Sequence, residues 1–403
     1  MRLGDAITLK RGYDLPNQAR VPGGVPIVSS SGVSGDHNEA KIAGPGVVTG
    51  RYGTIGQVHY VDGPFWPLNT TLYVQDFKGN HRRFVKYLLE TIDFHQFSDK
   101  AAVPGINRNH LHEAAITLPP VHEQERIAES LSKLEDRIDN LRQTNTILEA
   151  VAQALFKSWF VDFNPVRAKA EGREPEGMDA ATAALFPSEF EDSELGPIPK
   201  GWRTGTLADV SSLNASKWTA RKHPPTVKYI DLSGAHNNRI DQPMEFSFDE
   251  APSRARQHLR EGDTIIGTVR PGNRAFAYIH EPDANLTGST GFAVLSPKAP
   301  HLSSYVYLTA TRDDAIDRLA NLADGGAYPA VRPSVVADTP CVIPHDDVFM
   351  AFASITTPLL ERIVQNSSLT RTLAETRDTL LPCLISGKLR LPDAQELLEE
   401  VAS

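Results

Sequence analysis

Two stretches of this sequence repeat each other at a fixed spacing of 225 residues, and no other feature constrains the fold as strongly. The stretch "AVPGINRNHLHEAAITLPP" begins at Ala102, and "AYPAVRPSVVADTPCVIPH" begins at Ala327. The same spacing continues without a gap into the following segments, where Leu134 aligns with Leu359. A repeat of this kind indicates that one structural unit occurs twice in the chain. We therefore predict a globular unit followed by a helical unit, and then the same pair again.

The two globular regions, residues 1–120 and 196–345, contain short apolar runs separated by Gly, Pro and Asn. The run "GVVTGRYGTIG" from Gly46 resembles "GDTIIGTVRPGN" from Gly262. Such runs indicate strands and turns. Segments such as "RRFVKYLLETI" and "SSYVYLTATRDDAIDRLANL" have the composition and length of helices. The predicted fold class is therefore α+β.

The helical regions, predicted at residues 121–165 and 346–392, carry apolar residues at alternating steps of three and four. This is the heptad pattern of a coiled-coil seam. Pro119 and Pro120 precede the first region, and prolines favour the start of a helix. The predicted seam consists of Ile127, Leu131, Leu134, Ile138, Leu141, Asn145, Leu148, Leu155 and Trp159 in the first region, and Leu359, Ile363, Leu373, Leu380 and Leu384 in the second.

Two such seams in one chain are expected to pair with each other, as an antiparallel coiled coil with pseudo-two-fold symmetry. Asn145 occupies a seam position, where a polar side chain lowers stability and can fix the register. Trp159 is predicted to be core of the helix pair. Phe160 and Phe163 have two alternatives, which are docking against a globular unit of this chain or against a partner subunit.

Acidic segments follow each helical region. Residues 166–195 are rich in Ala, Glu and Pro, and we predict a solvated connector there. The alternative for this segment is an interaction surface. The tail at residues 393–403 is also acidic.

The formal net charge of −9 does not exclude a nucleic-acid partner, because the acidic excess lies outside the globular regions. Both globular regions have a small net positive charge, and binding depends on charge that gathers on one face. The two cysteines, Cys341 and Cys383, are too few for a disulfide framework or a Cys-rich zinc pattern, and we expect them to be core thiols. Without an apolar targeting segment, the expected location is the cytoplasm.

The motifs of a base methyltransferase or a nucleotide-binding enzyme are missing. A base methyltransferase needs a D/N-P-P-aromatic loop and a glycine-rich cofactor loop, and "NPV" at Asn164 and "LPP" at Leu118 do not meet the first requirement. The string "SGKL" at Ser386 has Pro382 where a phosphate-binding loop needs glycine. The histidines show no metal-ligand spacing. We therefore expect no catalytic residues, no metal and no cofactor in this chain.

Four further motifs carry a resemblance to a known family. They are "LPPVHEQERIAESL" from Leu118, "ALFKSWFVDFNPV" from Ala154, "SELGPIPKGWRTGTLADV" from Ser193 and "LLPCLISGKLRL" from Leu380. The chain resembles, over almost its whole length, the specificity subunits of type I restriction-modification enzymes. The second helical region departs from the family pattern at its start, where "PHDDVFMAFASI" replaces a Gln-rich segment.

The resemblance implies two target recognition domains, 1–120 and 196–345, each reading one half of a bipartite DNA site, and helical spacers that set the distance between the halves. It also implies a complex with two modification subunits, which methylate adenine at N6 with S-adenosylmethionine, and with a restriction subunit. This chain would then be a non-catalytic subunit that binds double-stranded DNA. No membrane association is expected. The alternatives are a stand-alone enzyme and a scaffold without a DNA role, and salt-sensitive binding of duplex DNA distinguishes the scaffold.

Candidate DNA-binding residues are polar and basic side chains on loops, since Arg, Lys, Asn, Gln, Ser and Thr contact base edges and phosphates. Arg51 and Arg270 are the strongest candidates, because each follows an apolar run and is followed by a glycine within two residues, as in an exposed turn. For Asn69 and Thr290, capping of a turn is an equal alternative. The candidates are Lys10, Arg11, Arg20, Ser30, Arg51, Tyr52, Asn69, Thr70, Asn107 and Arg108 in the first domain, and Asn214, Lys217, Trp218, Arg221, Lys222, Arg270, Asn273, Arg274, Thr290, Tyr328 and Arg332 in the second.

Overall fold

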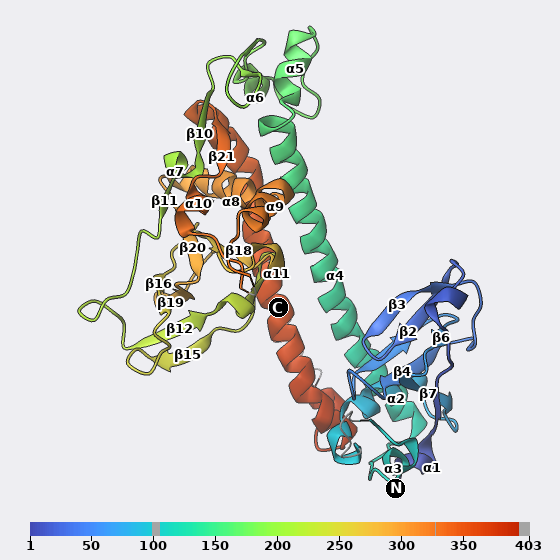
Figure 1. Ribbon diagram of the computed structural model, residues 1–403. Coiled ribbons are helices and arrows are strands. Elements are labelled where there is room, and N and C mark those ends of the chain that lie inside the picture. The colour runs from blue at the N-terminus through green and yellow to red at the C-terminus, as the bar shows by residue number, and fades with distance from the viewer. Residues whose placement is uncertain (99–104, 327, 395–403) are drawn as a thin grey trace. The chain divides into compact units, whose positions relative to one another are not determined.

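The computed structural model describes residues 1–98, 105–326 and 328–394 (Figure 1). The chain divides into two compact units. Unit 1 comprises residues 1–140 and the C-terminal segment that begins at Thr370, and unit 2 comprises residues 141–369. Both units contain strands and helices, so the fold class is α+β, as predicted.

Unit 1 is built around a four-stranded antiparallel sheet. The strand order is β1 (Thr8–Arg11), β7 (Thr71–Asp76), β4 (Gly46–Gly50) and β5 (Val58–Val61). Every residue of β4 is buried, as expected for a β-branched run between two neighbouring strands. The apolar run "GVVTG" is therefore a central strand of this sheet.

A second, smaller sheet of unit 1 has the order β3 (Gly32–His37), β2 (Val25–Ser29) and β6 (Trp66–Pro67). The β2 and β6 strands are parallel, and β6 continues after three residues into β7. The helices of this part are α1 (Leu3–Ala6), α2 (Arg82–Glu90) and α3 (Arg108–His112). Helix α2 buries Phe84 and Leu88 in the same core as Leu72 of β7.

Unit 2 repeats this arrangement. Its antiparallel sheet has the order β11 (Ser211–Leu213), β20 (Phe292–Pro297), β17 (Thr264–Gly267) and β18 (Phe276–Tyr278). Its second sheet has the order β15 (Met244–Ser247), β12 (Thr226–Ile230), β19 (Leu286–Ser289) and β16 (Ala255–His258). The β12 and β19 strands are parallel, and β19 leads into β20. The equivalent strand orders give the internal repeat a structural basis.

Further elements of unit 2 surround these sheets. Helix α8 packs against β17 and β20, and its residues Tyr305 and Leu308 belong to the main core of the unit. The additional elements are α7 (Leu207–Val210), α8 (Ser303–Thr311), α9 (Asp313–Asn321), α10 (Pro333–Ala337), and the strand pairs β10 (Arg203–Thr206) with β21 (Pro340–Ile343), β13 (Ala235–His236) with β14 (Arg239–Ile240), and β8 (Phe190–Glu191) with β9 (Ile198–Pro199).

The two long helices are α4 (Val121–Phe160) and α11 (Asp346–Ile385), and each has 40 residues (Figure 1). Both the first and the last residues of the two helices differ by the repeat spacing of 225. Helix α11 begins at the position equivalent to the start of α4, although its sequence there departs from the family pattern. Asp346 and Asp347 favour this start, because they place negative charge in the first turn of the helix. Among the described helices, none is long and apolar enough to cross a membrane.

Within each unit, segments of α4 and α11 pack against each other and run in opposite directions. In unit 1, Leu131 of α4 shares a core with Leu380 and Leu384 of α11. In unit 2, the Trp159 ring of α4 lies 5.5 Å from the Phe352 ring of α11. Later residues of α4 therefore meet earlier residues of α11.

The buried face of these helices is wider than the predicted seam. Phe156 is 1% exposed whereas its predicted neighbour Leu155 is half-buried, and Leu360 is fully buried whereas Leu359 is half-buried. The reason is that the globular part of unit 2 covers a second side of α4, where Tyr305 lies 5.5 Å from Phe156. The heptad pattern describes only the contact between the two helices, so it does not predict this contact with the globular part.

Aromatic residues at the end of α4 dock against the globular part of unit 2. The Phe160 ring lies 5.0 Å from Tyr305 and 6.0 Å from Trp202, and Phe163 lies 6.0 Å from Trp202. Trp159 is 3% exposed in the same core. Of the two alternatives for Phe160 and Phe163, the structure shows docking against this chain's own second globule.

The segment expected to be a solvated connector is packed in part. Helix α4 ends at Phe160, because Phe163 takes a left-handed backbone conformation (φ 54°) and a new helix, α5 (Asn164–Ala170), begins after it with Pro165 in its first turn. A further helix, α6 (Ala180–Ala184), follows. Val166 and Phe186 are buried in the core of unit 2. The prediction of a solvated connector relied on the acidic composition of the segment and did not take these two apolar side chains into account.

The second helical region also ends earlier than predicted. Helix α11 ends at Ile385, before Gly387 with its positive φ of 73°. Leu391 and Ala394 are buried in the core of unit 1. The remainder of the predicted tail, residues 395–403, lies outside the described residues, as do the repeat residues 102–104 and 327.

Candidate nucleic-acid interface

In unit 1, three loop segments meet at the end of β4. The backbone amides of Arg51 and Tyr52 donate to the Thr70 carbonyl at 2.9 and 3.1 Å, and the Ile106 amide donates to the Arg51 carbonyl at 3.0 Å. Gly50 permits this turn, because the Thr54 carbonyl oxygen leaves no space for a Cβ atom there. The structure thus brings together candidates from three separate parts of the sequence.

The side chains of this first loop cluster (Ser30, Arg51, Tyr52, Asn69, Thr70 and Asn107) are partly solvent-exposed. The Arg51 guanidinium lies 4.5 Å from the centre of the Tyr52 ring, and its Nε donates to the Ile106 carbonyl at 3.4 Å. The Tyr52 ring is 36% exposed. An arginine held over an aromatic ring presents its remaining N–H donors in a fixed direction, as recognition of a guanine edge requires.

Unit 2 has an equivalent loop cluster at the end of β17. The Thr268 amide donates to the Gly291 carbonyl at 2.9 Å, and the Val331 amide donates to the Thr268 carbonyl at 2.9 Å. These two bonds correspond to those of Arg51 with Thr70 and Ile106. The position equivalent to Arg51 is therefore Thr268, and Arg270 lies two residues beyond it.

Arg270 nevertheless lies in the second loop cluster (Thr268, Arg270, Asn273, Thr290, Tyr328 and Arg332). Its amide donates to the Pro329 carbonyl at 2.7 Å, and its guanidinium lies 5.0 Å from the Tyr328 ring. The Tyr328 ring is 73% exposed, which is unusual for a large aromatic side chain. Both units therefore present an arginine over an exposed tyrosine at the same place in the fold, although the residues come from different positions in the repeat.

Several candidates of the first domain are held by neighbours within the fold. The Asn69 amide and the Arg11 guanidinium both bind the Asp14 carboxylate. The Asn107 side chain accepts from the Asn109 amide and caps α3, where the neighbouring Arg108 is exposed. Lys10 lies 5.8 Å from the Tyr13 ring, and Arg20 has a buried Nε without a partner among the described residues.

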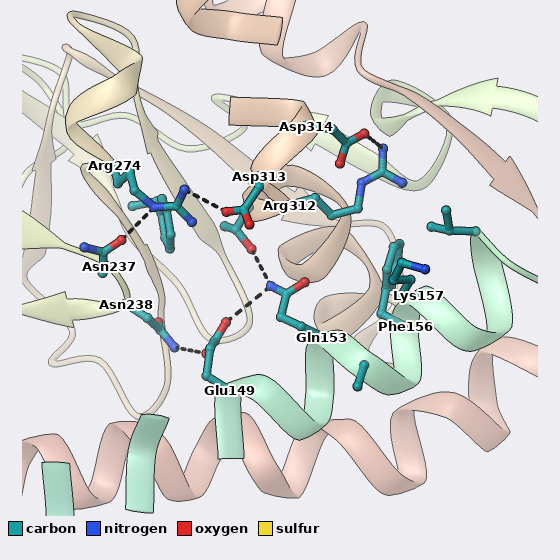
Figure 2. A pocket seen from close by; sticks show the side chains of 14 residues that line it. Glu149, Gln153, Phe156, Lys157, Asn237, Asn238, Arg274, Arg312, Asp313 and Asp314 are labelled. Carbon is teal, nitrogen blue, oxygen red and sulfur yellow. Dashed lines mark hydrogen bonds and ion pairs between the residues drawn. The ribbon is translucent and has the colours of Figure 1, made fainter. Parts of the chain in front are cut away.

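Two candidates of the second domain have internal partners. The Asn214 amide oxygen accepts from the Val294 amide at 3.0 Å, which ties the residue to β20. The Arg274 Nε donates to Asn237 at 2.9 Å, and its Nη1 forms an ion pair with Asp313 at 2.8 Å. Figure 2 shows Arg274 among the side chains that line a cavity, with dashed lines to Asn237 and Asp313.

A third group of candidates lies on a segment that runs beside β16. The Trp218 amide donates to the Arg256 carbonyl at 2.9 Å, and the Trp218 ring stacks on His258 at 4.1 Å. Lys217, Arg221 and Lys222 are exposed on this segment. We call it the basic arm, residues 217–222.

The list of candidates from the sequence omitted the arginines in and next to β16, the strand beside the basic arm. In "SRARQHLR", from Ser253, Ala255, Gln257 and Leu259 are buried, so the alternating Arg254, Arg256 and Arg260 share the other face. Burial, followed by the charges of Arg260 and Lys222, lowers the pKa of His258. The alternation of arginine with buried residues is a signal that the sequence contained.

A cavity of about 600 Å³ lies between α4 and the globular part of unit 2 (Figure 2). Glu149 of α4 accepts hydrogen bonds from Tyr307 at 2.9 Å, from Asn238 at 3.2 Å and from Gln153 at 3.4 Å. Burial raises the pKa of Glu149, although these hydrogen bonds oppose the shift. The residues around Glu149 join the helix to the globule, and within the described residues no group of three potential metal ligands occurs.

The chain thus contains two similar modules, each with a loop cluster at the end of a central strand. A family model described as "Type I restriction modification DNA specificity domain" matches residues 1–150. The HindI specificity subunit of Haemophilus influenzae is 23% identical over 337 residues, which cover 72% of this chain and 72% of that protein. The MjaIX specificity subunit of Methanocaldococcus jannaschii is 24% identical over 318 residues, which cover 77% of this chain and 69% of that protein.

A solved structure has a similar fold. The S subunit of a type I restriction-modification system from M. genitalium superimposes with a TM-score of 0.61 and 16% sequence identity, covering 96% of this chain and 95% of that chain. The chain is thus similar to type I restriction-modification specificity subunits over most of its length, and its first 150 residues match the DNA specificity domain of that family. This confirms the resemblance that the four sequence motifs indicated.

Proposed function

We propose that this chain reads a bipartite DNA site, with one loop cluster on each half. The cluster of Arg51 and Tyr52 would contact the first half-site, and the cluster of Arg270 and Tyr328 the second. The observation that carries the proposal is the equivalent backbone pairing of the two clusters, Ile106 with Arg51 and Val331 with Thr268. Two similar sites in one chain suit two separate half-sites.

The chemistry of the clusters supports contact with bases and phosphates. An arginine can donate two hydrogen bonds to guanine O6 and N7, and a stacked tyrosine limits its motion before binding. The basic arm, with Arg254 and Arg256 beside it, suits the DNA backbone, because phosphate contacts position a protein without specifying sequence.

The finer roles of the helices follow from the similarity to type I specificity subunits. Helices α4 and α11 would form an antiparallel coiled coil that sets the spacing between the half-sites and carries two modification subunits. Those subunits would bind S-adenosylmethionine and methylate adenine at N6, and a restriction subunit would complete the complex. This chain would contribute no catalytic group and would act in the cytoplasm.

The test is methylation-sensitive sequencing of DNA from cells that express this chain with its cognate modification subunit. We expect one methylated motif with two specified halves and an unspecified gap. Arg51→Ala should relax one half only, and Arg270→Ala the other half only. Lys133→Ala, an exposed cation on α4, is the matched control and should leave the motif unchanged.

Other results would contradict the proposal in distinct ways. If both arginine variants relaxed the same half, or if neither changed the motif, the loop clusters would not be the reading sites. Methyl transfer by the purified chain alone would identify an enzyme. Duplex DNA binding that is absent or insensitive to salt would favour a scaffold.

A further inference from the structure

An asymmetric pair of asparagines lies between α4 and α11 within unit 2. Asn366 Nδ2 donates to Asn145 Oδ1 at 2.8 Å. Asn145 Nδ2 donates to the Ile363 carbonyl and to Ser367 Oγ, both at 3.0 Å. Asn366 is 2% exposed and Asn145 is half-buried. The Asn145 amide is thus hydrogen-bonded at both its oxygen and its nitrogen, by α11 alone.

The repeat shows what a second copy of α4 would offer in place of α11. Because the two helices have bounds that differ by 225, position 366 of α11 corresponds to Leu141 of α4, and Ser367 corresponds to Arg142. In an α4–α4 pair with the same register, Asn145 of each helix would face Leu141 of the other. Its amide would lose its bonds to Asn366 and Ser367.

The two possible pairings therefore differ in polar complementarity more than in apolar burial. The apolar seam is similar in both helices, with Ile138 equivalent to Ile363 and Trp159 equivalent to Leu384, so it would accept either partner. The Asn145 Nδ2 could still donate to the backbone carbonyl of Ile138, the equivalent of Ile363, but its Oδ1 would have lost the Asn366 donor. A seam acceptor without its donor is costly, and a two-fold pair would contain two of them. Single buried asparagines are known to select partner and register in coiled coils.

We infer that Asn145 and Asn366 are specificity determinants of helix pairing, which direct α4 to α11 of its own chain and away from α4 of a second chain. The repeat creates the need for such a device, because two chains with similar helices can exchange partners. The inference rests on the repeat and on this contact, and it does not depend on the proposed DNA-reading function.

The experiment compares two single variants of the full-length chain that break the same hydrogen bond. Asn145→Leu removes the mismatch from an α4–α4 pair, since the introduced leucine side chain would face Leu141. Asn366→Leu leaves that mismatch in place. Tagged and untagged chains are mixed in denaturant, refolded together at micromolar concentration, and the mixed dimers are captured through the tag and quantified.

We expect both variants to lower the urea midpoint of unfolding, because each leaves one amide without its partner. Asn145→Leu should give at least tenfold more mixed dimer than the wild type, whereas Asn366→Leu should stay within about twofold of it. Thr144→Leu, which adds a leucine at an exposed position of α4, is the control for surface stickiness and should match the wild type.

Equal amounts of mixed dimer from Asn145→Leu and Asn366→Leu would overturn the inference, because exchange would then follow loss of stability alone. Wild-type amounts from Asn145→Leu would overturn it as well. If either single variant failed to refold, the double variant Asn145→Leu/Asn366→Leu replaces it. That variant has no orphaned amide, so it should recover stability and still form more mixed dimer than the wild type; additive losses of stability would show that the two residues are not coupled.

Discussion

The Tyr307 hydroxyl donates a hydrogen bond to the Glu149 carboxylate at 2.9 Å, which joins α8 to α4 within unit 2. Unit 1 contains the same kind of contact, because the Tyr87 hydroxyl of α2 donates to Glu135 of α4 at 2.8 Å. In both units a tyrosine on a helix of the globular part, α8 or α2, donates a hydrogen bond to a carboxylate on α4. The repeat would place the second of these carboxylates on α11, because α11 is the repeat equivalent of α4. Both carboxylates lie on α4 instead, so these two contacts do not follow the symmetry of the repeat.

The first prediction concerns this anchor. Tyr307→Phe should destabilise unit 2 by about 1.5–3 kcal/mol, because a buried carboxylate loses a hydrogen-bond donor. The same change should raise the pKa of Glu149 further, since the Tyr307 bond lowers it. Urea unfolding followed by tryptophan fluorescence measures the effect. Tyr328→Phe, at an exposed ring, is the matched control and should leave the unfolding midpoint unchanged.

The second prediction is a pH dependence that originates at Asp263. This side chain is 1% exposed in the turn before β17, where its Oδ2 accepts from the Arg260 amide at 2.8 Å. Burial raises the pKa of Asp263 from 3.8 to about 6. The folded state therefore holds a proton that the unfolded state releases, so the free energy of unfolding should fall as the pH rises from about 4 to about 6.

Asp263→Asn should remove this contribution. It should stabilise the protein at pH 7 by up to about 3 kcal/mol, because a shift of one pKa unit corresponds to about 1.4 kcal/mol. Thermal unfolding at pH 5 and pH 7 tests it, with Asp249→Asn at an exposed position as the control. A wild-type pH profile in the Asp263→Asn variant would assign the dependence to another group.

The third prediction addresses affinity at the loop clusters. Arg51→Ala and Arg270→Ala should each weaken binding of the cognate duplex by about 1–3 kcal/mol if each arginine contacts a base edge. The effect should be much smaller on a duplex of unrelated sequence. Fluorescence anisotropy of the reconstituted complex with both duplexes measures this difference. Equal weakening on the two duplexes would instead indicate phosphate contacts.

The fourth prediction distinguishes the basic arm from the loop clusters. The combined change of Lys217, Arg221 and Arg254 to Ala should weaken binding to all duplexes alike. It should also flatten the dependence of log K on log salt, by roughly 0.9 for each phosphate that the variant no longer neutralises. Changing Lys133, Lys200 and Lys388 together, all exposed and outside the loop clusters and the basic arm, gives a variant of equal charge for comparison. An unchanged salt slope would remove the arm from the DNA-binding surface.

The sequence by itself determined the repeat, the α+β class and the place of the long helices. These features depend on local patterns, because heptad periodicity, paired prolines and strand-length apolar runs act within a few residues. The start of α4 directly after Pro120 and the burial of Leu131 and Ile138 could be predicted for this reason. The polar Asn145 could also be recognised as exceptional in the seam.

Only the tertiary structure decided which residues meet. Asn366 as the partner of Asn145, Thr268 as the equivalent of Arg51, and Arg256 beside the basic arm all depend on contacts between distant segments. Loop lengths differ between the two globular parts, so one sequence alignment cannot carry a loop residue to its spatial counterpart. Burial of Phe156 in place of Leu155 has a similar cause, because a helix that packs on two surfaces at once buries a face wider than its heptad seam shows.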